Sequence, residues 1–147
     1  MRTEDSKTFF TKDEEAEIVA AIKRAELETS GEIRVHLEKH TEGENINRAK
    51  QVFEKAGMTK TKLRNGVLFY LAVQDHKFSI LGDKGIHEVV GSHFWEDIKS
   101  HVEAHFKKGD FVQGLVEGIE RAGTALKKHF PYQSDDKNEL PDEISKS

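Results

Sequence analysis

Val67-Leu68-Phe69-Tyr70-Leu71-Ala72-Val73 is the most apolar run in this 147-residue chain, and Gly66 stands directly before it. A continuous apolar run of this length is typical of a strand that is buried on both faces of its sheet. Such a sheet needs a layer of helices on each side. The run therefore predicts the central strand of a sheet that helices enclose.

The segment after this strand turns back at once. Gln74-Asp75-His76-Lys77 is a short polar connection, and Phe78–Leu81 is another apolar, strand-like stretch. A turn this short joins antiparallel strands. The second stretch ends at Gly82-Asp83-Lys84-Gly85, where glycine permits a tight turn and the carboxylate can either cap that turn or hold a cation.

The chain before the central strand predicts a helix, a strand and another helix. Residues 11–28 have apolar side chains at helical spacing, behind a capping-box pair of Thr11 and Glu14. Residues 32–38 alternate apolar and polar side chains, so this strand is expected to have one buried face and one at least partly wet face. Residues 45–57 return to helical spacing. Because a helix joins the two strands, they should run parallel.

Two more helices and a tail are predicted after the hairpin. Ser92 is expected to cap the first helix and Asp110 the second, which ends at Phe130-Pro131. Residues 132–147 are acidic and nearly free of large apolar groups, which predicts a disordered tail. The ordered part is a single domain over residues 8–131.

The predicted element order is helix, strand, helix, strand, strand, helix, helix. This order places the chain in the α/β class, as a three-layer α-β-α sandwich. Its small mixed sheet has helices on both faces, and the sequence predicts three strands for it.

Composition and charge limit the classes of function. The chain has no cysteine, which excludes disulfides, a thiolate nucleophile and metal sites that need cysteine. Its 27 acidic residues against 23 basic ones argue against nucleic acid as a partner. The sequence has neither a signal-peptide core near its start nor an apolar stretch long enough for a membrane span. A cytoplasmic protein is therefore expected.

Strand directions bring polar segments together at one edge of the predicted sheet. The end of the hairpin's second strand should lie beside the beginnings of the two parallel strands. Ser30-Gly31-Glu32, Arg64-Asn65-Gly66 and Gly82-Asp83-Lys84-Gly85 should therefore meet. We call the edge that these segments form the glycine rim.

The glycine rim offers hard oxygen ligands. Asp83, Glu32 and the amide oxygen of Asn65 suit Ca²⁺, or Mg²⁺ in its place, better than zinc or copper. The next helix starts from the same edge, so Glu88 and Asp97 are further candidate ligands. A structural alternative stays open, in which Asp83 caps the turn and Glu32 pairs with an arginine.

Short motifs along the chain resemble, in order, those of the TPM-domain family. They are Gly31-Glu32-Ile33-Arg34-Val35, Arg64-Asn65-Gly66-Val67-Leu68, Gly82-Asp83-Lys84-Gly85-Ile86, Phe94-Trp95 and Gly114-Leu115. The family includes a thylakoid-lumen acid phosphatase, photosystem II repair factors and a nematode receptor-modulating protein. The resemblance runs from Phe10 to Pro131.

This resemblance implies an α-β-α sandwich with a four-stranded sheet and a divalent-cation site, usually for calcium, in an acidic cleft. In some members it also implies phosphatase activity. Many members are exported and carry a membrane helix after the domain. Neither feature is visible in this sequence, so a soluble, stand-alone member of the bacterial type is expected.

Further residues are expected to position a ligand at the glycine rim. Gly82 and Gly85 permit tight turns, Trp95 walls the cleft, and Arg64 carries a charge that attracts phosphate. The leading prediction is a calcium-binding domain without an assigned catalytic residue. One alternative is a metal-assisted acid phosphatase, in which the cation polarises the phosphoryl oxygens and activates water. Another is a scaffold that recruits a protein partner and uses the cation as a structural pin.

The predicted helix after Ser92 carries a second candidate metal site. His101 and His105 have a spacing that can hold zinc. Glu103 lies two residues after the first histidine rather than one, which is not the arrangement of zinc proteases. The sequence places no third ligand, so partly exposed helix histidines are the favoured interpretation.

Overall fold

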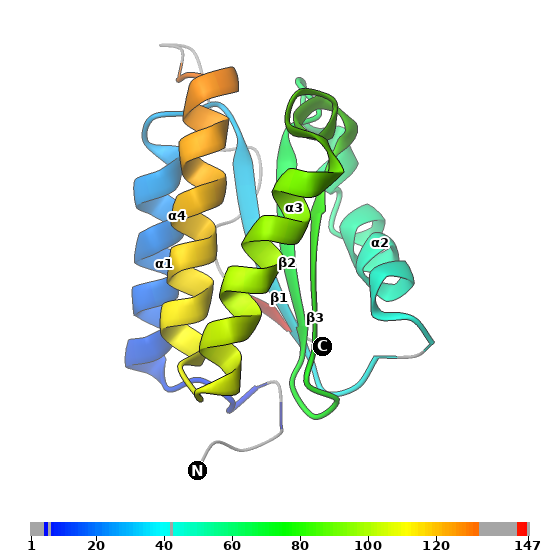
Figure 1. Ribbon diagram of the computed structural model, residues 1–147, viewed down its shortest axis with the longest axis vertical. Helices are drawn as coiled ribbons and strands as arrows, with labels where there is room; N and C mark the ends of the chain where they lie inside the picture. The colour runs from blue at the N-terminus through cyan, green and yellow to red at the C-terminus, as the bar shows by residue number, and fades with distance from the viewer. Residues whose placement is uncertain (1–4, 6, 42, 133–143, 147) are drawn as a thin grey trace.

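The structure is a computed structural model that describes residues 5, 7–41, 43–132 and 144–146 (Figure 1). The elements are α1 (Lys12–Glu26), β1 (Glu32–Glu38), α2 (Asn45–Lys55), the short 3-10 helix η1 (Met58–Lys60), β2 (Gly66–Ala72), β3 (Lys77–Gly82), α3 (Lys84–Lys107), α4 (Phe111–His129) and β4 (Ser145–Lys146). In the described part of the chain, no helix has the length and apolarity that a bilayer crossing requires.

The apolar run forms β2 at the centre of a mixed, 4-stranded sheet in the order β3-β2-β1-β4. β1 and β2 are parallel, with Glu32 opposite Gly66, and β2 and β3 are antiparallel, with Val67 opposite Gly82. The predicted parallel pair and the predicted hairpin are both confirmed.

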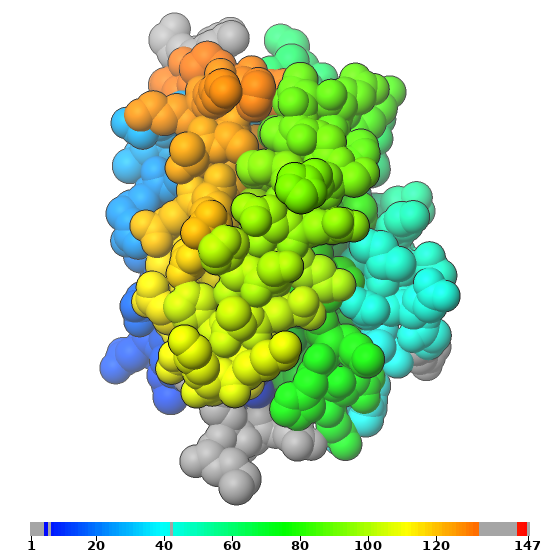
Figure 2. Space-filling model, viewed as in Figure 1, coloured from blue at the N-terminus to red at the C-terminus, as the bar shows by residue number. Residues whose placement is uncertain are grey.

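Helices cover both faces of the sheet, which confirms the three-layer α-β-α sandwich. Val67 and Phe69 of β2 point into the larger core, which α1, α3 and α4 close. Leu68 and Tyr70 point to the opposite face, where α2 contributes Phe53. Figure 1 shows α2 on the opposite side of the sheet from α1, α3 and α4. In the space-filling view, α3 and α4 lie side by side over the sheet (Figure 2).

The start of the third helix differs from the prediction. α3 begins at Lys84, with Asp83 as its N-cap, and not at Ser92. Gly91 interrupts the helix with a φ of 76° and a ψ of 171°. The apolar repeat after Ser92 therefore predicted only the second part of α3. By contrast, the capping box at the start of α1 is confirmed, because Thr11 Oγ1 accepts from the Glu14 amide over 3.1 Å.

The sheet has a fourth strand, which the family resemblance implied but the residue pattern did not predict. Ser145 pairs with His36 of β1 in a parallel register, so the prediction of a disordered tail over residues 132–147 is wrong at Ser145–Lys146. Ile144 packs against the larger core, and Lys146 Nζ lies 2.5 Å from Glu15 Oε2. Residues 133–143 and 147 lie outside the described residues. The domain therefore includes a segment beyond its predicted end at residue 131.

Candidate functional site

Backbone hydrogen bonds bring the segments of the glycine rim together. The Asp83 amide donates to the Gly66 carbonyl over 2.9 Å, and the Gly85 amide donates to the Arg64 carbonyl over 2.8 Å. The Glu32 amide donates to the Asn65 carbonyl over 3.5 Å. These bonds continue the ladders of β1, β2 and β3 past their ends. The rim is thus built by the sheet and by the first turn of α3.

Asp83 has two partners at this rim. Its carboxylate accepts from Arg64 Nε at Oδ2 over 2.6 Å and from Arg64 Nη2 at Oδ1 over 2.8 Å. Oδ1 also accepts from the Lys84 amide over 2.8 Å, which caps α3. The hydrogen bond to Asp83 raises the pKa of Arg64. The structural alternative expected Asp83 as a cap, which the structure shows, and an arginine on Glu32, whereas Arg64 pairs with Asp83.

Gly82 and Gly85 serve close approach rather than an unusual turn. A Cβ at Gly85 would lie 2.2 Å from the Leu63 carbonyl oxygen, and a Cβ at Gly82 would lie 2.2 Å from Cζ2 of Trp95. Neither glycine has a positive φ, whereas Arg64 does, at 54°. The expectation that these two positions need glycine for a tight turn is therefore wrong. They make room for the start of α3 and for an indole ring.

Trp95 covers the end of β3. Its ring lies on Gly82, and its Nε1 donates to His87 Nδ1 over 3.0 Å. Phe94 meets the ring edge to face, with centroids 4.9 Å apart. His87 was missed by sequence reasoning, because the segment before Ser92 was not assigned to a helix.

The remaining predicted ligands separate into buried and exposed groups. Glu32 is 2% exposed and Asn65 is 1% exposed, and both lie at the rim. Asn65 Nδ2 donates to Ser30 Oγ over 3.3 Å. Glu88 and Asp97 are exposed residues of α3, and Asp97 lies 3.9 Å from His101 on the next turn. The structure brings together the segments that carry Asp83, Glu32 and Asn65 but leaves Glu88 and Asp97 on the helix surface.

The oxygen ligands of the rim suit a divalent cation, but their present hydrogen bonds leave no place for one at Asp83. Carboxylate and amide oxygens suit Ca²⁺. Yet Arg64 and the Lys84 amide already engage the Asp83 carboxylate. Among the residues that the structure describes, no three Asp, Glu or His side chains are grouped so that they could hold a metal ion. A cation at Asp83 would therefore have to displace Arg64.

Comparison with known proteins identifies the family. The TPM domain model matches residues 3–125. The chain belongs to the TPM-domain family. The solved structure of BA42, from the psychrophilic bacterium Bizionia argentinensis, has 52% identity and a TM-score of 0.90, and the match covers 99% of this chain and 100% of BA42. The comparison with curated proteins returned no match.

A more distant structure shares the fold alone. The N-terminal domain of cg2496 from Corynebacterium glutamicum is 14% identical to this TPM domain, with a TM-score of 0.64. The match covers 80% of this chain and 74% of that one. The two proteins therefore share the sandwich fold, but at this sequence identity the roles of individual side chains cannot be carried over from one to the other.

A buried polar cluster on the α2 face of this TPM domain was not predicted. Glu38 accepts from Arg48 Nε over 2.9 Å and from the Tyr70 hydroxyl over 2.5 Å. His36 Nε2 lies 3.6 Å from Glu38 Oε1, and His36 Nδ1 bonds to Ser145 Oγ. Burial lowers the pKa of His36 and raises the pKa of Tyr70. The alternating face of β1 was expected to be partly wet, but His36 and Glu38 are buried there.

The two helix histidines of the TPM domain tie helices together. His105 Nε2 lies 2.5 Å from Glu117 Oε2 of α4, and Arg121 bonds to the same carboxylate over 3.3 Å. The hydrogen bond from His105 is the main reason that the pKa of Glu117 is lowered. His101 Nδ1 stands further off, 3.9 Å from Glu117 Oε1. The contacts of His101 and His105 with Glu117 therefore join α3 to α4.

Proposed function

We propose that this TPM domain binds a divalent cation, Ca²⁺ or Mg²⁺, at the glycine rim, in competition with Arg64 for the Asp83 carboxylate. The observation that carries the proposal is the position of Asp83. Asp83 is 7% exposed, and its carboxylate is held in place as a helix cap. It lies next to the segments that carry the buried Glu32 and Asn65. A buried carboxylate needs a positive partner, because its charge has lost the stabilisation that water gives.

Arg64 is the exchangeable member of the pair. The Arg64 side chain is 35% exposed, whereas the Asp83 side chain is 6% exposed. The guanidinium can therefore rotate away from Asp83 into the solvent at a small cost in free energy, because it is already partly hydrated. Asp83 stays in place because the Lys84 amide donates to it. A divalent cation would then replace the lost positive charge. Asp83, Glu32 and the Asn65 amide oxygen would hold it, and Ca²⁺ tolerates such an irregular oxygen shell better than Mg²⁺.

The test is a calcium titration that is followed by amide NMR. Saturable shifts at residues 32, 65 and 83 are expected in the wild type. Asp83→Asn should abolish them while it keeps the helix cap, because Asn caps as well as Asp. Arg64→Gln should tighten calcium binding several-fold, since it removes the competing charge.

Arg121→Gln is the matched control for Arg64→Gln. Arg121 also pairs with a carboxylate, that of Glu117, but it lies on α4. This control should bind calcium as the wild type does. Shifts that centre on Asp75, at the opposite end of the sheet, would contradict the proposal. So would tighter binding in both arginine variants, which would report a general change in net charge.

The same variants test the two alternatives. A metal-assisted phosphatase at this rim should lose phosphomonoester hydrolysis in Asp83→Asn, and equal rates in both proteins would exclude it. A scaffold that needs only a structural pin is favoured by one observation, because Arg64 already supplies a positive partner to Asp83. That alternative predicts no saturable calcium shifts in either the wild type or Arg64→Gln.

A further inference from the structure

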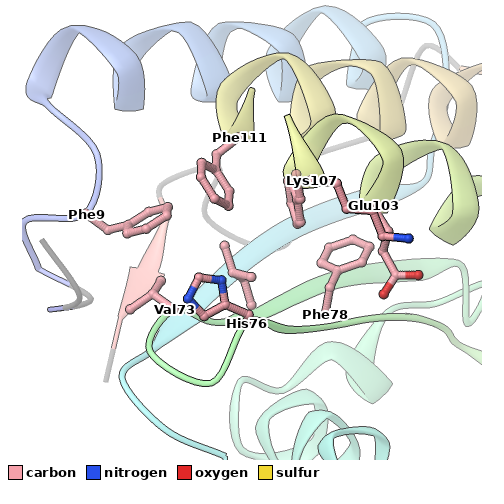
Figure 3. Close-up of a pocket in the computed structure, with 9 residues that line it drawn as sticks. Phe9, Val73, His76, Phe78, Glu103, Lys107 and Phe111 are labelled. Carbon is pink, nitrogen blue, oxygen red and sulfur yellow. The ribbon is translucent and has the colours of Figure 1, made fainter. Parts of the chain in front are cut away.

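At the end of the sheet opposite the glycine rim, α3, α4 and the β2–β3 hairpin surround a pocket of about 260 Å³ (Figure 3). We call it the hairpin pocket. Its apolar lining consists of Phe9, Leu71, Val73, Phe78, Phe106 and Phe111. Protein interiors are packed so closely that voids much larger than a water molecule are few. A pocket of this size is therefore a feature to explain rather than a packing defect.

Aromatic rings from separate elements form its walls. The Phe78 and Phe106 centroids are 5.2 Å apart at an interplanar angle of 82°, and those of Phe106 and Phe111 are 5.1 Å apart. Phe9 meets Phe111 edge to face, with centroids 5.0 Å apart. Because each ring is held by its neighbour, the walls cannot easily collapse into the space. The pocket is thus preformed, as small-molecule sites usually are.

Polar groups stand at its mouth. His76, in the β2–β3 hairpin, has a φ of 54°, a conformation that few residues other than glycine adopt. Glu103 and Lys107 lie one turn apart near the end of α3 and also line the pocket. In Figure 3 the His76 imidazole lies beside Val73, and the Glu103 carboxylate lies on the far side of Phe78.

We propose that the hairpin pocket binds a small amphipathic carboxylate. Its short acyl or aromatic body would lie among the phenylalanine rings. Its carboxylate would lie at the mouth, where the ammonium group of Lys107 would hold it. Glu103, one turn before Lys107 on α3, would repel the carboxylate, so the head group would lie on the side of Lys107 that faces away from Glu103. This site is separate from the glycine rim and does not depend on a cation there.

The proposal predicts a preference for an anionic head group. Octanoate, octan-1-ol and octylamine share one apolar body and differ in charge, so each is titrated into the full chain and followed by amide NMR. Octanoate should give saturable shifts at His76, Phe78 and Phe111 and should leave the amides of Glu32 and Asp83 unchanged. It should bind about tenfold more tightly than octan-1-ol, as the loss of a charge-assisted hydrogen bond implies.

Two variants separate the head-group site from the apolar site. Lys107→Gln should weaken octanoate binding about tenfold and leave octan-1-ol binding unchanged. Lys108→Gln is the matched control, because Lys108 is exposed and does not line the pocket. Phe111→Trp should weaken both ligands by filling part of the space. A melting temperature near that of the wild type shows that each variant is folded.

Three outcomes would overturn the proposal. Equal affinity for octanoate and octan-1-ol would refute the anionic class. Tighter binding of octylamine would assign the mouth to Glu103 instead. The absence of saturable shifts in the pocket would show that these ligands do not enter it. None of these outcomes bears on the calcium titration, because the hairpin pocket and the glycine rim lie at opposite ends of the sheet.

Discussion

Arg64 donates two hydrogen bonds, of 2.6 and 2.8 Å, to the carboxylate of Asp83, and the same carboxylate caps α3. Arg64 belongs to the loop before β2, and Asp83 to the junction of β3 and α3. The pair therefore fixes the first turn of a long helix to the start of the central strand. Capping and ion pairing can be separated by substitution at this one position.

Asp83→Ala should destabilise the fold by about 1–2 kcal/mol, because it removes the helix cap and leaves Arg64 without its partner. Asp83→Asn keeps a capping side chain and should cost less than half of that. Urea unfolding of both variants measures the free energies. Equal losses would show that the charge, rather than the cap, carries the contribution of Asp83.

Gly85→Ala should cost about 3 kcal/mol, because the new Cβ would meet the backbone oxygens of Leu63 and Arg64 at 2.2 and 2.6 Å. Gly43→Ala is the comparison. Gly43 has a φ of 67°, and a Cβ added there would meet nothing within 4 Å, so only backbone strain of about 1 kcal/mol is expected. Urea unfolding should rank the two variants in this order, and the reverse order would refute the close-approach role of Gly85.

Glu38→Gln should destabilise the protein by about 3 kcal/mol, because it leaves the Arg48 guanidinium beside a buried neutral group. The Glu38 side chain is 7% exposed, whereas that of Glu117 is 28% exposed. Glu117→Gln, which also removes a carboxylate from an arginine, should cost less than about 1 kcal/mol. Similar losses in the two variants would contradict the role of burial.

Stability should fall between pH 7.5 and 5.5 in part because of His36. Burial lowers its pKa below the ordinary value of 6.5, so the unfolded chain binds a proton more readily than the folded one in this window. The contribution is complete above pH 6.5 and is lost as the pH falls. His36→Gln should therefore show a smaller drop in urea midpoint over this range, and a drop equal to that of the wild type would contradict the assignment.

The sequence predicted the parts of the fold that depend on local pattern. The apolar run of β2 and the short connection after it were enough to place the hairpin, and the capping box marked the start of α1. The meeting of the glycine-rim segments followed from strand direction. What strand direction could not show is that Asp83 pairs with Arg64, a contact between side chains that leaves no pattern in the sequence.

Other features depend on contacts that have no local signal. β4 consists of Ser145 and Lys146, which are too few to show a strand pattern, and its partner His36 lies 109 residues before Ser145. The polar side chains of β1 look like a wet face until Arg48 and Tyr70 enclose Glu38. The hairpin pocket likewise needs residues from distant segments, and nothing in the spacing of its phenylalanines points to it.

The pairing of β4 with β1 has a consequence for the order of folding. β1 is synthesised early, but the strand that covers its outer edge comes only at residue 145. Until then the edge of β1 presents unpaired backbone groups, which are a template for association with other chains. A contact between such distant residues also forms slowly. During synthesis, the outer edge of β1 is therefore open to misassociation, and this exposure is reduced at His36 and Leu37 when Ser145 and Lys146 pair with them.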